Sequence, residues 1–566
     1  MGSNYSRDTI FSPEQENLAL QILGSIQTAQ EAVLFLLEDE ALDNAGLFQE
    51  VSAILSNLLD MIRQSSLPYR ETLELVKLPI ACQSMKESLT AICTLWKKDR
   101  ERCTMKLRFE LLPALENAYM EFYFWTYVYT HTDREKTYYE EELSELASNR
   151  YINHAVETGQ YKYEVSFMVL AYNKLEYTKM CVESLLRNIP DGLTYELILW
   201  DNGSSDGTQA YFESIHPEKL VESRINWSVG SLSHRIFEGK YCFSISNDVI
   251  ILPHSIENML KCIQSDERIA WVVPSTPNIS NLQVVPAQYQ SWDEMEAFAM
   301  KNNIPNAFRW EERVRLCDPI VLARSDVLFS SQGLNPSGYL VKNPNSFPDD
   351  RNSLLLRRKG YKMVLAKDAY CHHFGSVTLK DEIQQQNEQK FYLEGRREFY
   401  NAFGVDPWGT GSCYDPVFLS RVVGEEHGHV EVLGINCGLG SNSLKIKEQI
   451  KEYCHNLDTC LSNITDDSSF LLDLKGISDT AQTITTIKEW KAFLNGHAYQ
   501  YIVWETPFLL KHKFKTILEA CMDALAPGGK LIIKLTDQSR EAIIRNFPDR
   551  KELGNDWVIC QRGAQI

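Results

Sequence analysis

Three apolar segments that each end in polar residues constrain the fold of this chain more strongly than any other feature. They have the composition of buried strands and cover residues 165–171, 195–200 and 242–246. Polar residues follow them at Asn173, Asp201 and Asp248, and a helical pattern separates the first two segments. Strands that alternate with helices indicate a parallel sheet, where ligands bind outside the carboxyl ends of the strands. These three residues are therefore predicted to contact one ligand.

The length, charge and cysteine content of the chain narrow its class. At 566 residues it is too long for one hydrophobic core, so about three or four domains are expected. A net charge of -19 argues against nucleic acid as a partner. The 14 cysteines form no CxxC pair, which is typical of free thiols in a reducing compartment. The sequence has neither a signal-peptide core nor the roughly 20 apolar residues of a membrane helix, so a cytoplasmic protein without a membrane span is expected.

The residue pattern changes three times along the chain, which predicts a multidomain α/β protein. Residues 1–150 have helical periodicity and are expected to form a helical domain, whose first helix begins with a capping box of Ser12 and Gln15. Strands alternate with helices over 151–401, and a Gly- and Pro-rich linker follows at 402–426. A second α/β pattern occupies 427–566.

The middle region resembles family 2 glycosyltransferases, which have the GT-A fold. The resemblance rests on three motifs at the strand ends, namely Ala171-Tyr172-Asn173, Asp201-Asn-Gly-Ser-Ser-Asp-Gly-Thr208 and Ser246-Asn247-Asp248. It implies a nucleotide-sugar site built from Tyr172, Asn173, Asp201, Asn226, Arg235, Asn247 and Asp248. It also implies that Asp248 holds Mg²⁺ or Mn²⁺ beside the donor diphosphate. Ser246 replaces the first aspartate of the family's metal-binding motif.

Two later segments resemble the catalytic part of the same family. The segment from Phe347 to Tyr361 matches the one that carries the general base, which makes Asp349 the expected base, or Asp350 if the match shifts by one residue. Both aspartates also suit the first turn of a helix. His372 and His373 follow another apolar strand, and the resemblance implies that His373, or else His372, completes the metal site or contacts the diphosphate. Residues Trp310, Glu311 and Glu312 are expected to line the acceptor side.

The C-terminal region resembles class I S-adenosylmethionine-dependent methyltransferases, with a Rossmann-like fold. The loop Val430–Gly440 matches the cofactor loop, but Gly434 replaces its opening acid and Asn436 its first glycine. Asp458 and Asp466 are the candidate ribose-binding acids. A domain that has lost the cofactor and binds the acceptor or supports assembly is favoured over an active methyltransferase.

These patterns predict an inverting, metal-dependent glycosyltransferase. It would move a hexose or N-acetylhexosamine from a nucleotide donor, a UDP-sugar by resemblance, to an acceptor hydroxyl. The acceptor would be a protein serine or threonine, as on a flagellin, or a surface glycan. A bifunctional glycosyltransferase and methyltransferase, or a non-catalytic scaffold, are the alternatives, and the oligomeric state is not predicted.

Overall fold

The computed structural model describes most of the chain, namely residues 11–38, 45–67, 70–75, 77–96, 100–128, 143–227, 229–327, 347–375, 388–506, 514–537 and 539–561. The chain forms two compact units. The first comprises Met1–Ile250, Pro319–Asn352 and Phe374–Pro407. The second comprises Ile251–Asp318, Ser353–His373 and Trp408–Ile566.

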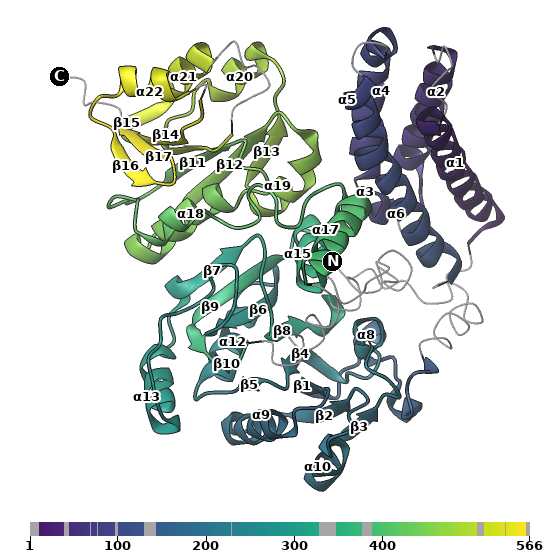
Figure 1. The fold of residues 1–566 in the computed structure, drawn as a ribbon, viewed down its shortest axis with the longest axis vertical. Helices are drawn as coiled ribbons and strands as arrows, with labels where there is room; N and C mark the ends of the chain where they lie inside the picture. Colours follow the sequence, from purple (N-terminus) through teal and green to yellow (C-terminus); the bar gives the residue numbers. More distant parts are fainter. Residues whose placement is uncertain are drawn as a thin grey trace. The chain divides into compact units, whose positions relative to one another are not determined.

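The first unit begins with the predicted helices. They are α1 (Pro13–Glu38), α2 (Ala45–Gln64), α3 (Arg70–Leu75), α4 (Leu78–Leu95), α5 (Arg100–Lys106) and α6 (Leu112–Tyr123), with π-helical turns at Leu107–Leu111 and Phe124–Val128 (Figure 1). The capping box of α1 is confirmed, since the Gln15 amide donates to Ser12 Oγ at 3.2 Å and the Ser12 amide to Gln15 Oε1 at 3.0 Å. Proline stands in the first turn of both α4 and α6, where its missing N–H costs nothing.

Helix α1 packs its apolar stripe into the core of this helical region. Ala19, Ile22, Ile26 and Val33 are completely buried there, together with side chains from α2, α4 and α6. Among the described residues, α1 is also the one helix whose length and composition would let it cross a membrane, with a mean hydropathy of 1.3. The expectation that no segment reaches that length and apolarity was therefore wrong for α1. Its apolar stripe packs into the helical core, and 33% of the apolar window is buried.

Five of the described strands in the first unit lie side by side in the order β3-β2-β1-β4-β8. They are β1 (Tyr163–Ala171), β2 (Tyr195–Asp201), β3 (Lys219–Glu222), β4 (Gly239–Ser246) and β8 (Ile320–Arg324). The first four are parallel, and β8 runs antiparallel to β4. Helices α9 (Leu175–Asn188) and α10 (Thr208–Ile215) make the crossovers, and α8 (Ala155–Thr158), α11 (Gly230–Ser233), β5 (Val249–Ile250) and α17 (Glu388–Phe403) complete the unit. Helix α15 (Pro348–Arg358) begins in it.

A buried ion cluster joins the amino ends of these parallel strands. Lys219 Nζ lies 2.7 Å from Glu196 and 2.8 Å from Glu238, and Ser166 Oγ donates to Glu196 at 2.5 Å. Glu196 has no exposed surface, so its charge needs these partners. The amino ends are thus closed by structural contacts, which leaves the carboxyl ends as the edge for a ligand.

The second unit contains two groups of strands. The first group is β6 (Ile269–Ser275), β9 (Lys362–Tyr370) and β7 (Trp310–Arg313), with helices α12 (Ser255–Gln264) and α13 (Trp292–Asn302) and the short β10 (His372–His373). The second is a seven-stranded sheet in the order β13-β12-β11-β14-β15-β17-β16. Its strands are β11 (Val430–Ile435), β12 (Thr459–Thr465), β13 (Thr480–Thr483), β14 (Tyr499–Trp504), β15 (Leu525–Lys534), β16 (Lys551–Gly554) and β17 (Trp557–Gln561).

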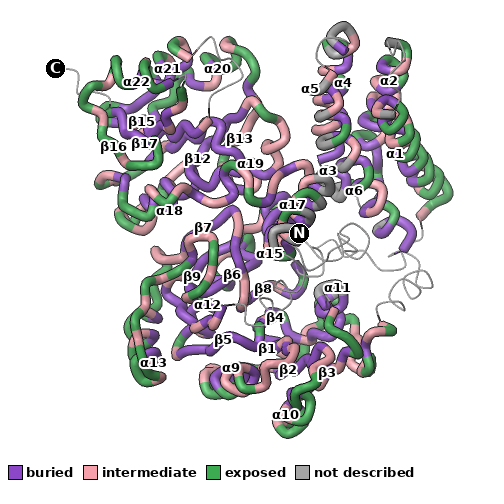
Figure 2. Tube along the Cα trace, viewed as in Figure 1, coloured by how far each residue is buried: buried purple, intermediate pink, exposed green. Residues whose placement is uncertain are grey.

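The seven-stranded sheet is parallel except for the pairs formed by β17. Its helices are α18 (Ser441–Cys454), α19 (Leu471–Ile477), α20 (Ile487–Leu494), α21 (Phe514–Asp523) and α22 (Arg540–Asn546). The central strands β11 and β14 are mostly buried, and exposed residues lie on α20, α22 and the edge strand β16 (Figure 2). The mixed α/β architecture and the N-terminal helical region are confirmed, whereas the resemblance to methyltransferases and the domain boundaries stay predictions.

Candidate functional site

The carboxyl ends of β1, β2 and β4 lie at one edge because these strands are parallel and in register. Ala171 pairs with Asp201, and Leu170 pairs with Ser246. Asn247 Nδ2 donates to the Asn173 carbonyl at 2.9 Å and to Thr178 Oγ1 at 2.9 Å. The first and third strand ends are therefore in direct contact, as predicted.

The loop after β2 connects the remaining strand end to the other two. Ser204 contacts both sides, since its amide donates to Asp201 Oδ1 at 3.0 Å and its Oγ accepts from the Asn173 amide at 2.8 Å. Asn173 Oδ1 accepts from the Ser205 amide at 2.9 Å. Asn173 has a φ of 54°, in the left-handed region that asparagine tolerates better than most residues. Hydrogen bonds to the loop thus fix the backbone turn that ends β1.

Asp206 in the same loop was not predicted as a functional residue. Its Oδ2 accepts from the amide of Leu175, the first residue of α9, and its Oδ1 accepts from Thr208 Oγ1 at 2.6 Å. Partial burial raises the pKa of Asp206, but the hydrogen bonds from Thr208 and Leu175 outweigh it and lower the pKa. The carboxylate therefore stays ionised and joins the starts of two crossover helices. The turn-rich composition of 201–208 was its only signal in the sequence.

The predicted nucleotide contact Asn226 is held by a residue that sequence reasoning missed. Buried Asn202 donates through Nδ2 to Asn226 Oδ1 at 2.8 Å and to the Trp227 carbonyl at 2.9 Å. Asn226 itself is exposed. Tyr172, between β1 and Asn173, is half-buried. The edge therefore offers exposed and partly exposed polar groups on a fixed backbone.

Arg235 is more enclosed than its expected diphosphate role suggests. The residue is buried, its Nη1 lies 3.3 Å from His154 Nδ1, and its carbonyl accepts from the Asn153 amide at 2.8 Å. These contacts tie the segment before β4 to the segment before α8. The diphosphate contact stays a prediction.

Asp248 directly follows the Ser246-Asn247 turn at the end of β4. Asp248 is buried, its carbonyl accepts from the Phe374 amide at 3.1 Å, and neighbouring Ser246 is exposed. In the part of the chain that the structure describes, no group of three or more His, Cys, Asp or Glu residues is arranged to hold a metal ion. A single carboxylate still fits Mg²⁺ or Mn²⁺, because such ions take most remaining ligands from substrate phosphates and water.

The two candidate bases stand in the first turn of α15. Asp350 is buried and Asp349 is half-buried. The Arg351 amide donates to the Phe347 carbonyl at 3.0 Å, which closes this turn. Carboxylates are favoured at a helix N-terminus, so both aspartates suit this position in α15. The greater exposure of Asp349 agrees with its choice as first candidate, and the choice stays a prediction.

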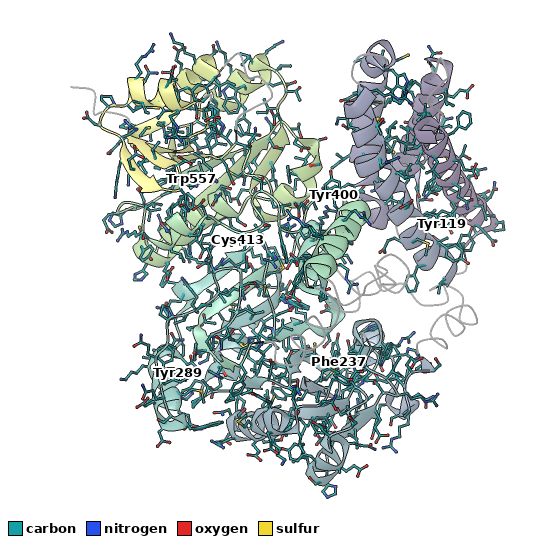
Figure 3. All side chains as sticks on the ribbon, viewed as in Figure 1. Tyr119, Phe237, Tyr289, Tyr400, Cys413 and Trp557 are labelled. Atoms are coloured by element: carbon teal, nitrogen blue, oxygen red, sulfur yellow. The ribbon has the colours of Figure 1, made fainter. Side chains whose placement is uncertain are left out.

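The two histidines lie in the second unit, on β10. His372 Nδ1 lies 2.5 Å from Tyr289 Oη, which is 2.9 Å from Tyr370 Oη (Tyr289 is labelled in Figure 3). Burial, and then the charge of His373, lower the pKa of His372, so its ring is neutral near pH 7. The His373 carbonyl accepts from Asn278 Nδ2 at 3.0 Å. Tyr289, which the sequence gave no reason to select, thus fixes one ring nitrogen of His372.

The expectation that Glu311 lines the acceptor side was wrong. Glu311 lies on β7 with 3% of its surface exposed, and its carboxylate pairs with Arg313 at 2.8 Å, Lys445 at 2.9 Å and Lys367 at 3.2 Å. Burial raises the pKa of Glu311, but these three cations outweigh it and hold the pKa far below its usual range. Trp310 Nε1 donates to buried Asp368 at 2.9 Å. Both residues therefore have structural roles.

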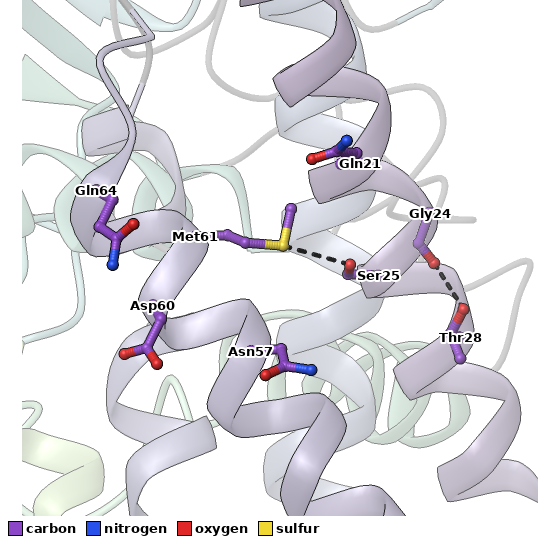
Figure 4. A pocket seen from close by; sticks show the side chains of 8 residues that line it. All are labelled: Gln21, Gly24, Ser25, Thr28, Asn57, Asp60, Met61 and Gln64. Carbon is purple, nitrogen blue, oxygen red and sulfur yellow. Dashed lines mark hydrogen bonds between the residues drawn. The ribbon is translucent and has the colours of Figure 1, made fainter.

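A hollow of about 550 Å³ lies between α1 and α2, away from these residues (Figure 4). Gln21, Ser25, Asn57 and Asp60 are among the residues that line it. Ser25 Oγ contacts Met61 Sδ at 3.6 Å. Its single carboxylate and neutral amides do not form a catalytic arrangement, and none of the predicted site residues lines it.

Comparison with known proteins supports the assignment of the middle region. Residues 166–310 match the family model for glycosyl transferase family 2. No curated protein matches the sequence. Solved structures that align with it include GalNAc-T7 with UDP, GalNAc and Mn²⁺ (12% identity, 37% of this chain and 43% of that chain, TM-score 0.29). Another is the mannosyltransferase PcManGT from Pyrobaculum calidifontis with GDP-Man and Mn²⁺ (13% identity, 51% of this chain and 74% of that chain, TM-score 0.30).

The alignment spans less than half of the GalNAc-T7 chain. Both TM-scores are below 0.5, so these two structures establish neither the fold nor the chemistry of this chain. The family model matches the segment that contains all three motifs at the strand ends. This segment of the chain is therefore similar to glycosyl transferase family 2.

Proposed function

We propose that this protein is an inverting glycosyltransferase that moves a hexose or N-acetylhexosamine from a nucleotide donor to an acceptor hydroxyl. The observation that carries the proposal is the hydrogen-bonded edge formed by Asn173, Asp201, Ser204 and Asn247. This edge lies within the segment that matches the family model. The donor is a UDP-sugar, and its nucleotide contacts Tyr172, Asn173, Asp201 and Asn226.

Asp248 holds the divalent ion in this proposal. The buried carboxylate ends β4 next to Asn247, which is part of the hydrogen-bonded edge. Mg²⁺ or Mn²⁺ bound there would neutralise the charge that develops on the diphosphate when its bond to the sugar breaks. The contribution of His373 or His372 to this ion stays a prediction from the resemblance.

Asp349 takes the proton from the acceptor hydroxyl in this proposal, and Asp350 is the second candidate. The acceptor is a serine or threonine of a protein, such as a flagellin, or a surface glycan.

All 14 cysteines are free, which supports the proposal of a reducing, cytoplasmic location.

A donor screen with the purified protein tests the activity. Nucleotide release from a panel of UDP- and GDP-sugars in the presence of Mn²⁺ is expected for one donor. The release should be lost in Asp248→Ala. No turnover with any donor would favour the alternative of a non-catalytic scaffold.

Mass spectrometry of co-expressed proteins then identifies the acceptor by a hexose or N-acetylhexosamine mass shift.

The base is tested by comparing Asp349→Asn with Asp350→Asn. Loss of the true base is expected to reduce kcat by about 10²–10⁴-fold, because the acceptor proton then has no positioned acceptor. Asp293→Asn is a matched control, since Asp293 stands in the first turn of α13 as the candidates do in α15. If neither candidate variant differs from this control, the assignment of the base to α15 is wrong.

A further inference from the structure

The segment Trp408–Asp415, here named the strap, runs across the loop that follows β11. Two loop amides donate to strap carbonyls: Leu439 to Thr410 at 3.0 Å and Ser441 to Gly411 at 3.1 Å. The strap amide of Asp415 donates to Asn442 Oδ1 at 2.8 Å. Cys413, labelled in Figure 3, belongs to the strap. The amide of Ser441, the first residue of α18, is thus paired with the strap backbone.

The strap and the loop touch backbone to backbone. A Cβ added to Gly411 would lie 2.0 Å from the Cys437 carbonyl oxygen, and one added to Gly438 would lie 2.0 Å from the Thr410 carbonyl oxygen. Such close approach requires glycine on both sides. No ligand atom fits between two main chains at this separation.

The strap occupies the position where an open α/β sheet binds its ligand. In the order β13-β12-β11-β14-β15, strands β12 and β13 are added on one side of β11, whereas β14 and β15 are added on its other side. The strand order therefore reverses between β11 and β14. Ligands of such sheets bind outside the carboxyl ends of the strands at this switch point, with anionic groups at the following helix N-terminus. In this chain the loop 436–440 and residues 441–446 of α18 are all buried.

The residues that would recognise S-adenosylmethionine do not fit that cofactor. Gly434 stands where the loop motif has an acid, and a Cβ there would lie 1.9 Å from Asn463 Oδ1. Asn436 has a φ of 48° and donates through Nδ2 to Asp466 Oδ1 at 3.1 Å. The other candidate acid, Asp458, is exposed and pairs with His429 at 2.8 Å. Asn436, Asp466 and Asp458, which a cofactor would need to contact, are therefore already paired with other side chains of this protein.

The side of α18 that its own sheet does not cover is packed against β7 and the strap. Lys445 pairs with Glu311 of β7 at 2.9 Å, and the Glu312 amide donates to Glu448 Oε2 at 3.0 Å. The ring of Tyr414, a strap residue, lies 4.6 Å from Lys445 Nζ and 4.5 Å from the guanidinium carbon of Arg313. Tyr414 thus links the strap to α18 and to β7.

We propose that the strap permanently fills the ligand crevice of the C-terminal sheet. The C-terminal domain then binds no S-adenosylmethionine or other adenine-containing cofactor. Its role is structural: α18 and the strap support β7 through the buried charges of Glu311, Arg313 and Lys445. The proposal does not depend on the transferase activity and is tested separately from it.

Calorimetry on the full-length protein tests the closed crevice. S-adenosylmethionine, S-adenosylhomocysteine and NAD are each expected to give no saturable binding up to about 1 mM. Stoichiometric binding of any of them to the unsubstituted protein would overturn the proposal, whatever the donor screen shows.

Amide hydrogen exchange tests the contact itself. Peptides that cover the strap and residues 436–446 are expected to be protected together. Gly411→Ala should cause loss of protection in both, because the new methyl group meets the Cys437 carbonyl. Gly428→Ala is the matched control: Gly428 has a φ of 71° beside 75° for Gly411, but an added Cβ there meets nothing within 4 Å. Equal exchange in the two variants would contradict the proposal.

A milder variant covers the case in which Gly411→Ala does not fold. Tyr414→Phe removes only the hydroxyl that accepts from Arg313 Nη2 at 3.2 Å. Faster exchange confined to the strap and residues 436–446 is expected. Unchanged exchange in both peptides would show that the strap is not held in this way.

Discussion

Glu505 is a buried carboxyl group whose ionisation should make stability depend on pH. It follows β14, has 8% of its surface exposed and accepts from Asn442 Nδ2 at 2.7 Å. Burial raises its pKa to about 7, although Asn442 and Lys534 act in the opposite direction and Asp415 adds to the rise. Because the folded state binds this proton more tightly than the unfolded state, stability is greatest below the unfolded pKa and falls as pH rises through 7.

Glu505→Gln should remove this pH dependence. The expected free energy of unfolding is similar to that of the unsubstituted protein at pH 4.5 and higher by roughly 2–3 kcal/mol at pH 8, because glutamine keeps the acceptor without the buried charge. Urea unfolding of both proteins at the two pH values measures this free energy of unfolding. Glu519→Gln, which changes an exposed residue paired with Lys515, is the control and should show no such difference.

Ser246 allows a gain-of-function test of the metal site. Ser246→Asp would restore a second carboxylate near Asp248 at an exposed position. The Mn²⁺ concentration for half-maximal turnover is then expected to fall, because a second hard anionic ligand strengthens binding of the ion. Ser246→Asn, which adds similar bulk without charge, should leave it unchanged. If both variants behave alike, Asp248 is not the metal ligand.

At the scale of elements, Asp473 joins α19 to α15 within the second unit. Its carboxylate lies 2.7 Å from Arg357 and 3.2 Å from Arg358, and Asp473 has no exposed surface. Removing one member of a buried ion group leaves uncompensated charge, so Asp473→Asn is expected to lower the free energy of unfolding by about 3–5 kcal/mol. Chemical denaturation measures the loss.

An exposed helical pair is the control for this prediction. Glu176→Gln disrupts the contact of Glu176 with Lys179 on α9, which lies at 2.9 Å but is exposed to solvent. Its effect should stay below about 1 kcal/mol, because solvent screens exposed pairs. Similar losses in the two variants would mean that Asp473 does not balance the two arginines.

At the scale of the whole molecule, 76 acidic against 57 basic residues should repel polyanions. The protein is expected not to bind double-stranded DNA or heparin near 0.15 M salt, because neutralising phosphates requires clustered lysine and arginine. Retention on a heparin column, followed by elution with salt, measures this. Specific retention at that salt would show a local basic surface that the net charge conceals.

Local patterns in the sequence were sufficient for much of the fold. Ser12 and Gln15 are three residues apart, so their capping box depends on one helical turn. The strands that end at or just before Asn173, Asp201 and Asp248 follow from continuous apolar runs, and parallel pairing alone brings their ends to one edge. The free cysteines and the N-terminal helices likewise follow from composition and periodicity.

The elements and the edge of the sheet were thus predictable from the sequence, because they depend on neighbours along the chain. The contacts of the polar side chains depend on residues far apart in the chain, so no local pattern predicts them. Glu311 was expected to contact the acceptor, but its carboxylate pairs with Lys445, which is 134 residues away in the sequence. The strap lay in an expected linker, and its occupation of the crevice depends on contacts between Gly411 and Cys437 that no local pattern records. The three strand ends define where the candidate site lies, and long-range packing determines which polar groups there are left to contact a ligand.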